Sequence, residues 1–168
     1  MQNAKDTFYE VLRGRLAALN PERTIVVRGV TRPGVLVDEN ELRACTALPD
    51  CFHLQWVSEA ADVQGAMPLV TLGCVVSYAT AGTAMNGGLD RGRALAAMDG
   101  ELLAAVRQCP QNTVKNNYGA LANGGAAVAM NTRVWWSDVE FGPVKVDRDR
   151  VMRTATVQVM SYQEAGEL

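Results

Sequence analysis

The side chains that could perform catalysis are few in this sequence and are not arranged as a catalytic site. The chain has one histidine, His53, and a nucleophilic mechanism would need it beside a nucleophile and an orienting acid. Its sequence neighbours Cys51 and Ser58 are the only nucleophiles that proximity suggests. Because His53 alternates with Phe52 and Leu54, we expect it on the surface of a β-strand. The sequence therefore favours a protein that is not an enzyme, and a small hydrolase using His53 is a remote alternative.

The cysteines and the acidic residues do not form a metal-binding motif. The cysteines are Cys45, Cys51, Cys74 and Cys109. No two of them are spaced as C-x-x-C, and Cys74 shares a strand face with apolar residues, which is typical of a buried thiol in a reducing compartment. The acids Asp38, Glu39 and Glu41 follow a short strand and are expected in a solvated turn. We therefore expect no metal and no cofactor.

A glycine-rich turn between Ser77 and Asp90 joins a predicted strand to a predicted helix, which is where phosphate-binding loops occur. The turn contains neither G-K-[ST] nor G-x-G-x-x-G, so the residues that hold a phosphate are missing. We interpret it as a flexible connection. A small-molecule binding module that uses this turn is a second remote alternative.

Composition excludes several classes of protein. The 168 residues are 48% hydrophobic and 20% charged, which suits one core and predicts a single domain over residues 1–168. A formal net charge of -2 provides no global positive field to hold a nucleic-acid backbone. The sequence shows no secretory leader and no run of about 18 apolar residues. We expect a soluble, intracellular protein without a membrane partner.

Apolar spacing predicts two amphipathic helices that would position the remaining elements. The stripe of the first helix is Phe8, Val11, Leu12, Leu16 and Leu19. That helix starts near Lys5 and is stopped by Pro21. The stripe of the second helix is Leu95, Met98, Leu102 and Val106. Asp90 is expected to cap its first N–H groups, and the helix should end before Pro110.

Alternating and β-branched residues predict strands separated by short turns. The predicted strands cover residues 22–30, 35–37, 52–56, 70–78, 133–141 and 153–162. The first two could form a hairpin around a turn at Arg32–Gly34. Strands adjacent in sequence with only two helices predict an α+β fold, in which two helices pack on one face of an antiparallel or mixed β-sheet.

Two segments are predicted to lack regular structure. Residues 111–131 are rich in Asn, Gly and Ala and have no sustained period, which predicts a long flexible loop. A loop of this length is usually functional or ordered by a partner. The C-terminal residues 163–168 are predicted to form a solvated tail.

Five residues are candidates for a protein interface. Adjacent residues of a strand point to opposite faces, so one of Trp135 and Trp136 should enter the core. The other needs a cover, supplied either by a partner or by another part of the same chain. Arg91 and Arg93, at the start of the second helix, are either solvated or interfacial. Tyr118, in the predicted loop, completes the candidate set.

Six segments in this order resemble the tail terminator, or tail-completion, proteins of tailed bacteriophages. The segments are RPGVLVDENEL, CFHLQW, PLVTLGCVVSYATAGT, LDRGRALAAMDGELLAAV, TRVWWSDVEFGP and RTATVQVMSY. Proteins of this family begin with a helix and place a long strand ending in tyrosine before an amphipathic helix. Their last strand has an R-x-A-x-V-x-V-x-x-Y pattern, which runs here from Arg153 to Tyr162. The segment 32–50 and the Asn/Gly loop depart from the simplest members, so no contact residues are transferred.

The resemblance implies a structural protein that forms a ring, of six copies, on the head-proximal end of a tail tube. Such a ring ends tube polymerisation and provides the surface for joining the head. The implied partners are further copies of the chain, the tail tube protein and a head-completion or neck protein, and DNA would pass through the lumen without specific binding. The implied location is the tail–neck region of the virion, after assembly in the host cytoplasm. A head–tail connector or neck protein, or the cap of a phage-tail-like injection device, is the alternative within the same class.

Overall fold

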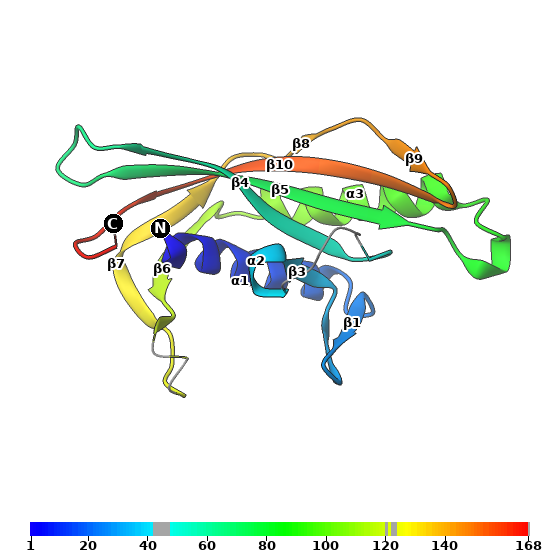
Figure 1. Cartoon of the computed structure of the whole chain (residues 1–168), viewed down its shortest axis with the longest axis horizontal. Helices are drawn as coiled ribbons and strands as arrows, with labels where there is room; N and C mark the ends of the chain where they lie inside the picture. The colour runs from blue at the N-terminus through cyan, green and yellow to red at the C-terminus, as the bar shows by residue number, and fades with distance from the viewer. Residues whose placement is uncertain (42–47, 120, 122–123, 168) are drawn as a thin grey trace.

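Two long helices packed on one face of a curled β-sheet make up most of the computed structural model, which describes residues 1–41, 48–119, 121 and 124–167 (Figure 1). The helices are α1 (Gln2–Leu19) and α3 (Arg91–Arg107). Both lie where their apolar stripes predict, and α1 ends just before Pro21. The predicted α+β class, with its two helices on one sheet face, is confirmed.

The sheet is mixed, with the strand order β3-β4-β5-β10-β7-β6, and β8 and β9 pair with β10. β3 runs parallel to β4, and the other pairs are antiparallel. A separate two-stranded sheet joins β1 and β2. The strands are β1 (Thr24–Val27), β2 (Val30–Pro33), β3 (Val35–Val37), β4 (Phe52–Asp62), β5 (Leu69–Thr80), β6 (Asn112–Asn117), β7 (Val128–Trp136), β8 (Glu140–Phe141), β9 (Lys145–Asp147) and β10 (Arg150–Tyr162). The short helices are α2 (Asp38–Glu41) and η1 (Ala84–Asn86).

β5 and β10 form the centre of the sheet, and each strand places buried residues at alternate positions, from Val70 to Tyr78 in β5 and from Ala155 to Ser161 in β10. They pair without interruption from Leu69↔Tyr162 to Thr80↔Val151. The buried face of β5 carries Val70, Leu72, Cys74, Val76 and Tyr78, as predicted. Each fully buried aliphatic side chain of this kind contributes about 1.5–3 kcal/mol. This pair is therefore the rigid axis of the molecule.

The curl of the sheet places α1 between its two edges. On one side the Tyr9 hydroxyl donates a hydrogen bond to the carbonyl oxygen of Val35 in β3, at 3.2 Å. On the other side the N–H of Asn116 in β6 donates to Thr7 Oγ1 at 3.0 Å. Between these contacts the ring of Phe8 meets Trp136 edge-on, with ring centroids 5.5 Å apart. The helix thus fills the concave side of the sheet.

Polar networks fix α3 on the sheet. The Tyr78 hydroxyl donates to Asp99, which also forms an ion pair with Arg153 at 2.6 Å. Burial and this hydrogen bond raise the pKa of Tyr78. At the other end of α3, Arg15 of α1 donates to the carbonyl oxygens of Ala105 and Gln108. These carbonyls have no partner inside the helix, so a side chain from the neighbouring helix caps them.

The predicted flexible loop over 111–131 is wrong at both ends. Residues 112–117 form β6 and residues from 128 form β7, which pair antiparallel, with Asn112 opposite Trp135 and Asn117 opposite Val128. This polar sequence forms a strand because distant groups hold its side chains and backbone: Glu167 binds Lys115, and Thr7 binds the N–H of Asn116. Part of the connection between the strands lies outside the described residues.

The prediction of a solvated tail over residues 163–168 is also wrong. Gln163 is buried, and the carboxylates of Glu164 and Glu167 form hydrogen bonds with β7 and β6. Glu164 accepts hydrogen bonds from the backbone N–H groups of Asn131 and Thr132 at 2.8 Å. Glu167 pairs with Lys115. The two carboxylates hold this segment against β6 and β7. Leu168 lies outside the described residues.

The first hairpin turns at a different place from the one predicted. β1 and β2 pair from Thr24↔Pro33 to Val27↔Val30, so the two-residue turn is Arg28–Gly29 rather than Arg32–Gly34. Both turn residues have positive φ, 51° and 79°, which matches the right-handed twist of a tight hairpin. β3 then leaves the hairpin and pairs in parallel with β4.

Candidate assembly interface

Hairpins and loops extend from the body of the molecule beyond the helices (Figure 1). One of them is the outer part of the β4–β5 hairpin, residues 57–68, which we call the arm. Its side chains from Val57 to Met67 are exposed, and its strands stay paired as far as Asp62↔Leu69. The pairing makes the arm a continuation of the central sheet, so its tip is held in a defined position.

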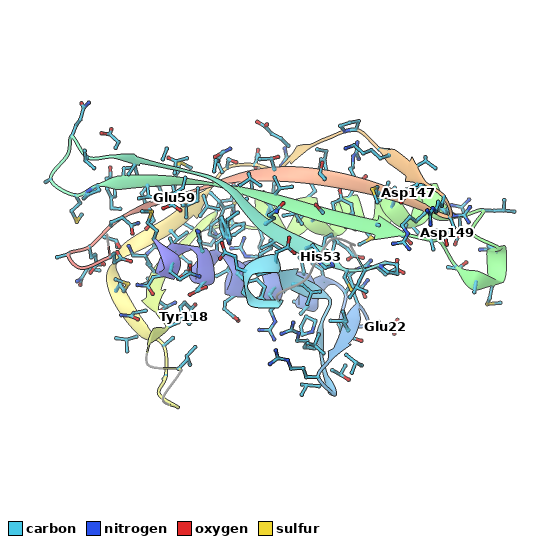
Figure 2. All side chains as sticks on the ribbon, in the orientation of Figure 1. Glu22, His53, Glu59, Tyr118, Asp147 and Asp149 are labelled. Atoms are coloured by element: carbon cyan, nitrogen blue, oxygen red, sulfur yellow. The ribbon has the colours of Figure 1, made fainter. Side chains whose placement is uncertain are left out.

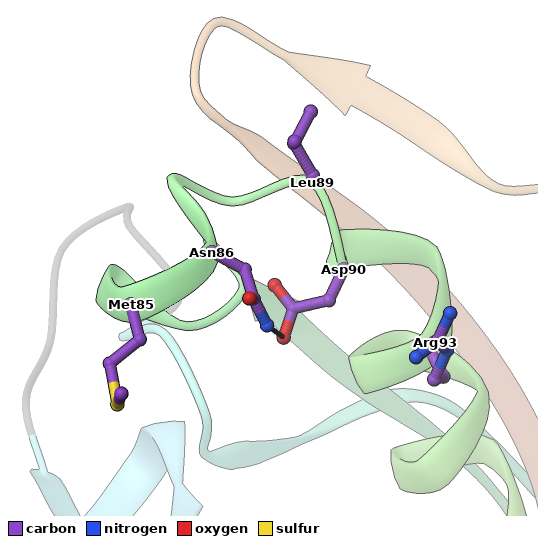
Figure 3. Close-up of a pocket in the computed structure, with 5 residues that line it drawn as sticks. All are labelled: Met85, Asn86, Leu89, Asp90 and Arg93. Atoms are coloured by element: carbon purple, nitrogen blue, oxygen red, sulfur yellow. Dashed lines mark hydrogen bonds between the residues drawn. The ribbon is translucent and has the colours of Figure 1, made fainter.

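The end loop, residues 81–90, follows β5 at the opposite end of the molecule. Its centre is the carboxylate of Asp90, which accepts hydrogen bonds from the N–H and the hydroxyl of Thr83, both at 2.9 Å, and from the amide of Asn86 at 3.4 Å (Figure 3). The hydrogen bonds from Thr83 lower the pKa of Asp90. Asp90 occupies the N-cap position of α3 but makes no side-chain cap bond. The predicted capping role is therefore wrong, because the carboxylate closes the loop instead.

The ordered end loop presents two large apolar side chains to solvent. Met85 is 98% exposed and Leu89 is 93% exposed. They border an open hollow whose other lining residues are Asn86, Asp90 and Arg93 (Figure 3). Other exposed apolar side chains also lie in or near the projecting hairpins and β9: Val26, Val30, Leu121, Val128, Val144 and Val146. Exposed apolar side chains that lie together, as Met85 and Leu89 do at this hollow, are typical of surfaces that meet another protein.

Two glycines next to each other in the end loop allow a matched test of its shape. Gly87 and Gly88 have φ of +57° and +77°, so alanine strains either position by about 1 kcal/mol. Only at Gly88 would the added Cβ collide with other groups, 2.9 Å from the carbonyl oxygen of Ala81 and 2.5 Å from Arg91 Nη2. We expect Gly88→Ala to speed amide hydrogen exchange over residues 83–91 more than Gly87→Ala does. Equal exchange in the two variants would contradict this packing.

The structure separates the five candidate interface residues. Arg91 and Arg93 lie at the end loop, where Arg91 Nε donates to the carbonyl oxygen of Asp149 at 2.7 Å and Arg93 is exposed. Trp135 is half-buried and packs against Tyr162. Trp136 is 5% exposed, which removes it from the surface candidates.

Tyr118, the fifth candidate, is half-buried and lies just beyond β6, far from the end loop (Figure 2). Burial raises the pKa of its hydroxyl, although hydrogen bonds with Thr7 and Asn116 act in the opposite direction. The candidates that share one surface are therefore Arg91 and Arg93.

Two of the residues considered for catalysis, His53 and Cys51, are buried, whereas Ser58 is exposed in the arm. His53 is 6% exposed, so the prediction of a strand-surface residue is wrong. Its Nε2 accepts a hydrogen bond from the N–H of Leu48 at 3.2 Å, and its Nδ1 lies 3.6 Å from Asp38 Oδ1. Cys51 and Cys74 are buried, and burial raises the pKa of Cys74 to about 12, which keeps it a thiol. Cys45 lies outside the described residues.

Neither a metal centre nor a membrane span is found in the part of the chain that the structure describes. No group of three or more His, Cys, Asp or Glu side chains there could hold a metal ion. Glu39 is instead 3.6 Å from Lys5, while the side chain of Glu41 is outside the described part. Among the same residues, no helix combines the length and apolar character that crossing a bilayer requires.

Comparisons with known proteins find similarity to solved structures, one of which matches at low sequence identity. No protein-family model matches the chain, and no curated protein matches it. The chain is similar to a chain of the solved structure "Virion of native gene transfer agent (GTA) particle", with 15% identity and a TM-score of 0.38. The match covers 92% of this chain and 91% of that one. A TM-score this low does not establish a common fold.

Proposed function

We propose that this chain is a structural protein of a phage-type virion and acts as a single domain. Copies of it form a ring on the head-proximal end of the tail tube, stop tube polymerisation and provide the surface that joins the head. The observation that carries the proposal is the arrangement of exposed apolar projections around one rigid two-layer body. The sequence resemblance to tail terminator proteins supplies the specific role.

The body suits repeated contacts between identical copies. A closed ring uses one pair of different surfaces on each copy, repeated around an axis. The arm and the end loop are two such surfaces, and both are positioned by β5. A third is the outer edge of β4, which beyond Leu54 pairs with no other strand in the described residues. Edges of this kind accept a strand from another chain unless they are protected.

Assembly is tested directly by measuring mass in solution and imaging the protein. We expect sedimentation velocity to show a single closed oligomer, and negative-stain electron microscopy to show rings alone and rings on the ends of tubes when tail tube protein is added. Sub-stoichiometric amounts of the chain should shorten the tubes that form. A chain that stays monomeric at all concentrations and ignores tube ends contradicts the proposal.

The same experiment distinguishes a role at the end of the tail tube from a role as a head–tail connector or neck protein. Rings that ignore tube ends but bind head particles or their connector would assign the chain to the neck instead. Rings that bind both support the terminator role, because only a terminator contacts the tube and then the head.

A further inference from the structure

We propose that neighbouring copies of this chain join end to end, with the arm tip of one copy seated against the end loop of the next. This inference deepens the proposed function and rests on it, because it names the two surfaces that make the ring contact. The partner of each surface is a second copy of the same chain.

The arm tip combines apolar side chains with negative charge. Val63 is 67% exposed and Met67 is 44% exposed. Both lie in the turn that joins β4 to β5, beyond the last paired residues Asp62↔Leu69. The charged residues of the arm are Glu59 and Asp62, and the segment from Val57 to Leu69 has no lysine or arginine. Glu59 pairs with Lys5 of α1 at 3.6 Å, so Asp62 is the acid that the arm tip offers to a partner. Asp62 Oδ1 accepts a hydrogen bond from the N–H of Gln64 at 3.0 Å, which shapes the turn and leaves the carboxylate at the surface.

The end loop combines apolar side chains with positive charge. Met85 and Leu89 are almost fully exposed, and Arg93 lines the hollow that they border. The β9–β10 turn lies beside the loop, because Arg91 donates to the carbonyl oxygen of Asp149. Together these elements carry five cations and three carboxylates: Arg91, Arg93, Lys145, Arg148 and Arg150 against Asp90, Asp147 and Asp149. The five cations exceed the three carboxylates by two, and Asp149 pairs with Arg150 at 3.7 Å, so the surface has a net positive charge.

The two surfaces lie at opposite ends of the molecule, so one copy cannot join its own arm to its own end loop. Figure 1 shows the arm at one end of the long axis and the end loop at the other, and Figure 2 places Glu59 toward the first and Asp147 and Asp149 toward the second. β5 runs from one surface to the other, and its 12 residues span about 40 Å at ~3.3 Å per residue. The spacing is thus set by a single fully paired strand. A contact between unlike ends is the kind that repeats around a ring.

Charge decides between this contact and the symmetric ones. An arm against an arm would oppose Asp62 to its own copy, and an end loop against an end loop would oppose Arg93 to Arg93. Like charges brought together in this way disfavour association, whereas opposite charges steer it and fix its orientation. The arm of one copy therefore complements the end loop of the next in both charge and apolar character.

A charge exchange between the two surfaces tests the electrostatic part. We expect Asp62→Arg and Arg93→Asp each to raise the concentration for half-maximal ring formation about tenfold or more, and the chain carrying both changes to recover most of the loss. Glu22→Arg is the matched control, because Glu22 is an exposed acid on neither surface and should leave assembly unchanged. All four variants should stay close to the wild-type melting temperature, since the altered side chains are exposed and Asp62→Arg loses only the exposed hydrogen bond from Gln64.

A mixing experiment tests the direction of the contact. An arm variant (Val63→Ser with Met67→Ser) and a loop variant (Met85→Ser with Leu89→Ser) should each remain monomeric. An equimolar mixture should give heterodimers and no rings, because one intact arm then meets one intact end loop. A loop variant that dimerises alone would instead show a symmetric arm contact and overturn the inference.

The outcomes distinguish this inference from the proposed function. If every variant still forms rings as the wild type does, the end-to-end contact is overturned, whereas the proposal that the chain forms a ring is retained. Rings that respond as expected but ignore tube ends and heads retain the contact and overturn the virion role. A wild-type chain that never assembles overturns both.

Discussion

Replacing Glu167 with glutamine should lower the free energy of unfolding by about 3–5 kcal/mol, because it removes the partner of a fully buried charge. The Lys115 side chain has no exposed surface, and its Nζ donates to Glu167 Oε2 and to the carbonyl oxygen of Tyr162, both at 2.6 Å. An ammonium group in this position keeps its hydrogen bond to Tyr162 but loses its counter-charge. Urea denaturation followed by circular dichroism measures the change.

An exposed ion pair provides the control for Glu167. Glu10 pairs with Arg13 at 3.2 Å on the surface of α1, and Glu10→Gln should cost less than about 1 kcal/mol. Equal effects of Glu10→Gln and Glu167→Gln would contradict the buried pair. A double variant with Lys115→Met and Glu167→Leu should recover most of the stability, because apolar replacement of both partners removes the uncompensated charge.

The same pair makes stability depend on acid. Burial by itself would raise the pKa of Glu167, but hydrogen bonds from Lys115, from the N–H of Glu164 and from Asn3 outweigh it and lower the pKa below its ordinary value. A group with a lowered folded-state pKa adds stability above its unfolded pKa and loses it as pH falls through the folded one. As the pH falls from the unfolded-state pKa of Glu167 to its folded-state pKa, the free energy of unfolding of the wild type should therefore decrease more steeply than that of Glu167→Gln.

The elements that can be predicted from the sequence are those whose own residues show a helical or strand-like spacing of apolar side chains. The stripes of α1 and α3 and the alternation in β5 and β10 locate these elements without reference to anything distant. β6 cannot be found in this way, because its sequence NTVKNN is polar and its partners are distant in the chain. It pairs with β7, and Lys115 binds Glu167 about fifty residues later. The C-terminal segment was predicted to be solvated for the same reason.

The candidate surfaces show the same division between local and distant information. Arg91 and Arg93 were identified because they open a predictable helix. The exposure of Met85 and Leu89 is not predicted by periodicity, because isolated apolar residues in a glycine-rich turn have no period. The presence of large apolar residues in such a turn is the one local signal of a contact. His53 was expected at the surface because its alternation resembles that of a half-covered strand. Nothing local to it indicates that the backbone of Leu48 would cover the ring.

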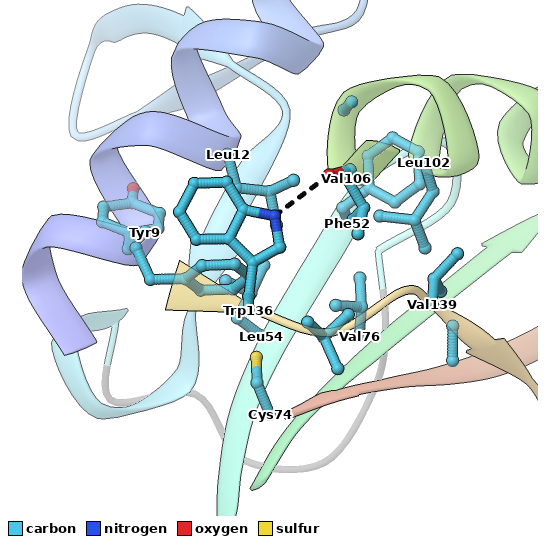
Figure 4. Close-up of a cluster of buried hydrophobic side chains, with 14 of the residues drawn as sticks. Tyr9, Leu12, Phe52, Leu54, Cys74, Val76, Leu102, Val106, Trp136 and Val139 are labelled. Atoms are coloured by element: carbon cyan, nitrogen blue, oxygen red, sulfur yellow. Dashed lines mark hydrogen bonds between the residues drawn. The ribbon is translucent and has the colours of Figure 1, made fainter. Parts of the chain in front are cut away.

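Trp136→Ala should destabilise the chain by about 3–5 kcal/mol, the cost typical of removing a buried tryptophan. The indole is 5% exposed and donates from Nε1 to the carbonyl oxygen of Val106 at 3.0 Å (Figure 4). It also packs against the ring of Phe8. The guanidinium of Arg15 lies 5.0 Å from the indole centroid. Removing the ring therefore opens a cavity where α1, α3 and the sheet meet. Thermal and urea denaturation measure the loss.

Trp135→Ala is the matched control, because the same residue type one position earlier points to the opposite face of β7. Its indole is half-buried and packs against the ring of Tyr162, with centroids 5.6 Å apart, so its loss should cost only about 1 kcal/mol. Similar losses in the two variants would contradict the assignment of faces in β7. Comparing assembly in the two variants separates the remaining roles: a weaker ring at unchanged stability in Trp135→Ala would place that indole in a contact between subunits, whereas Trp136→Ala should weaken the ring only as far as it unfolds the subunit.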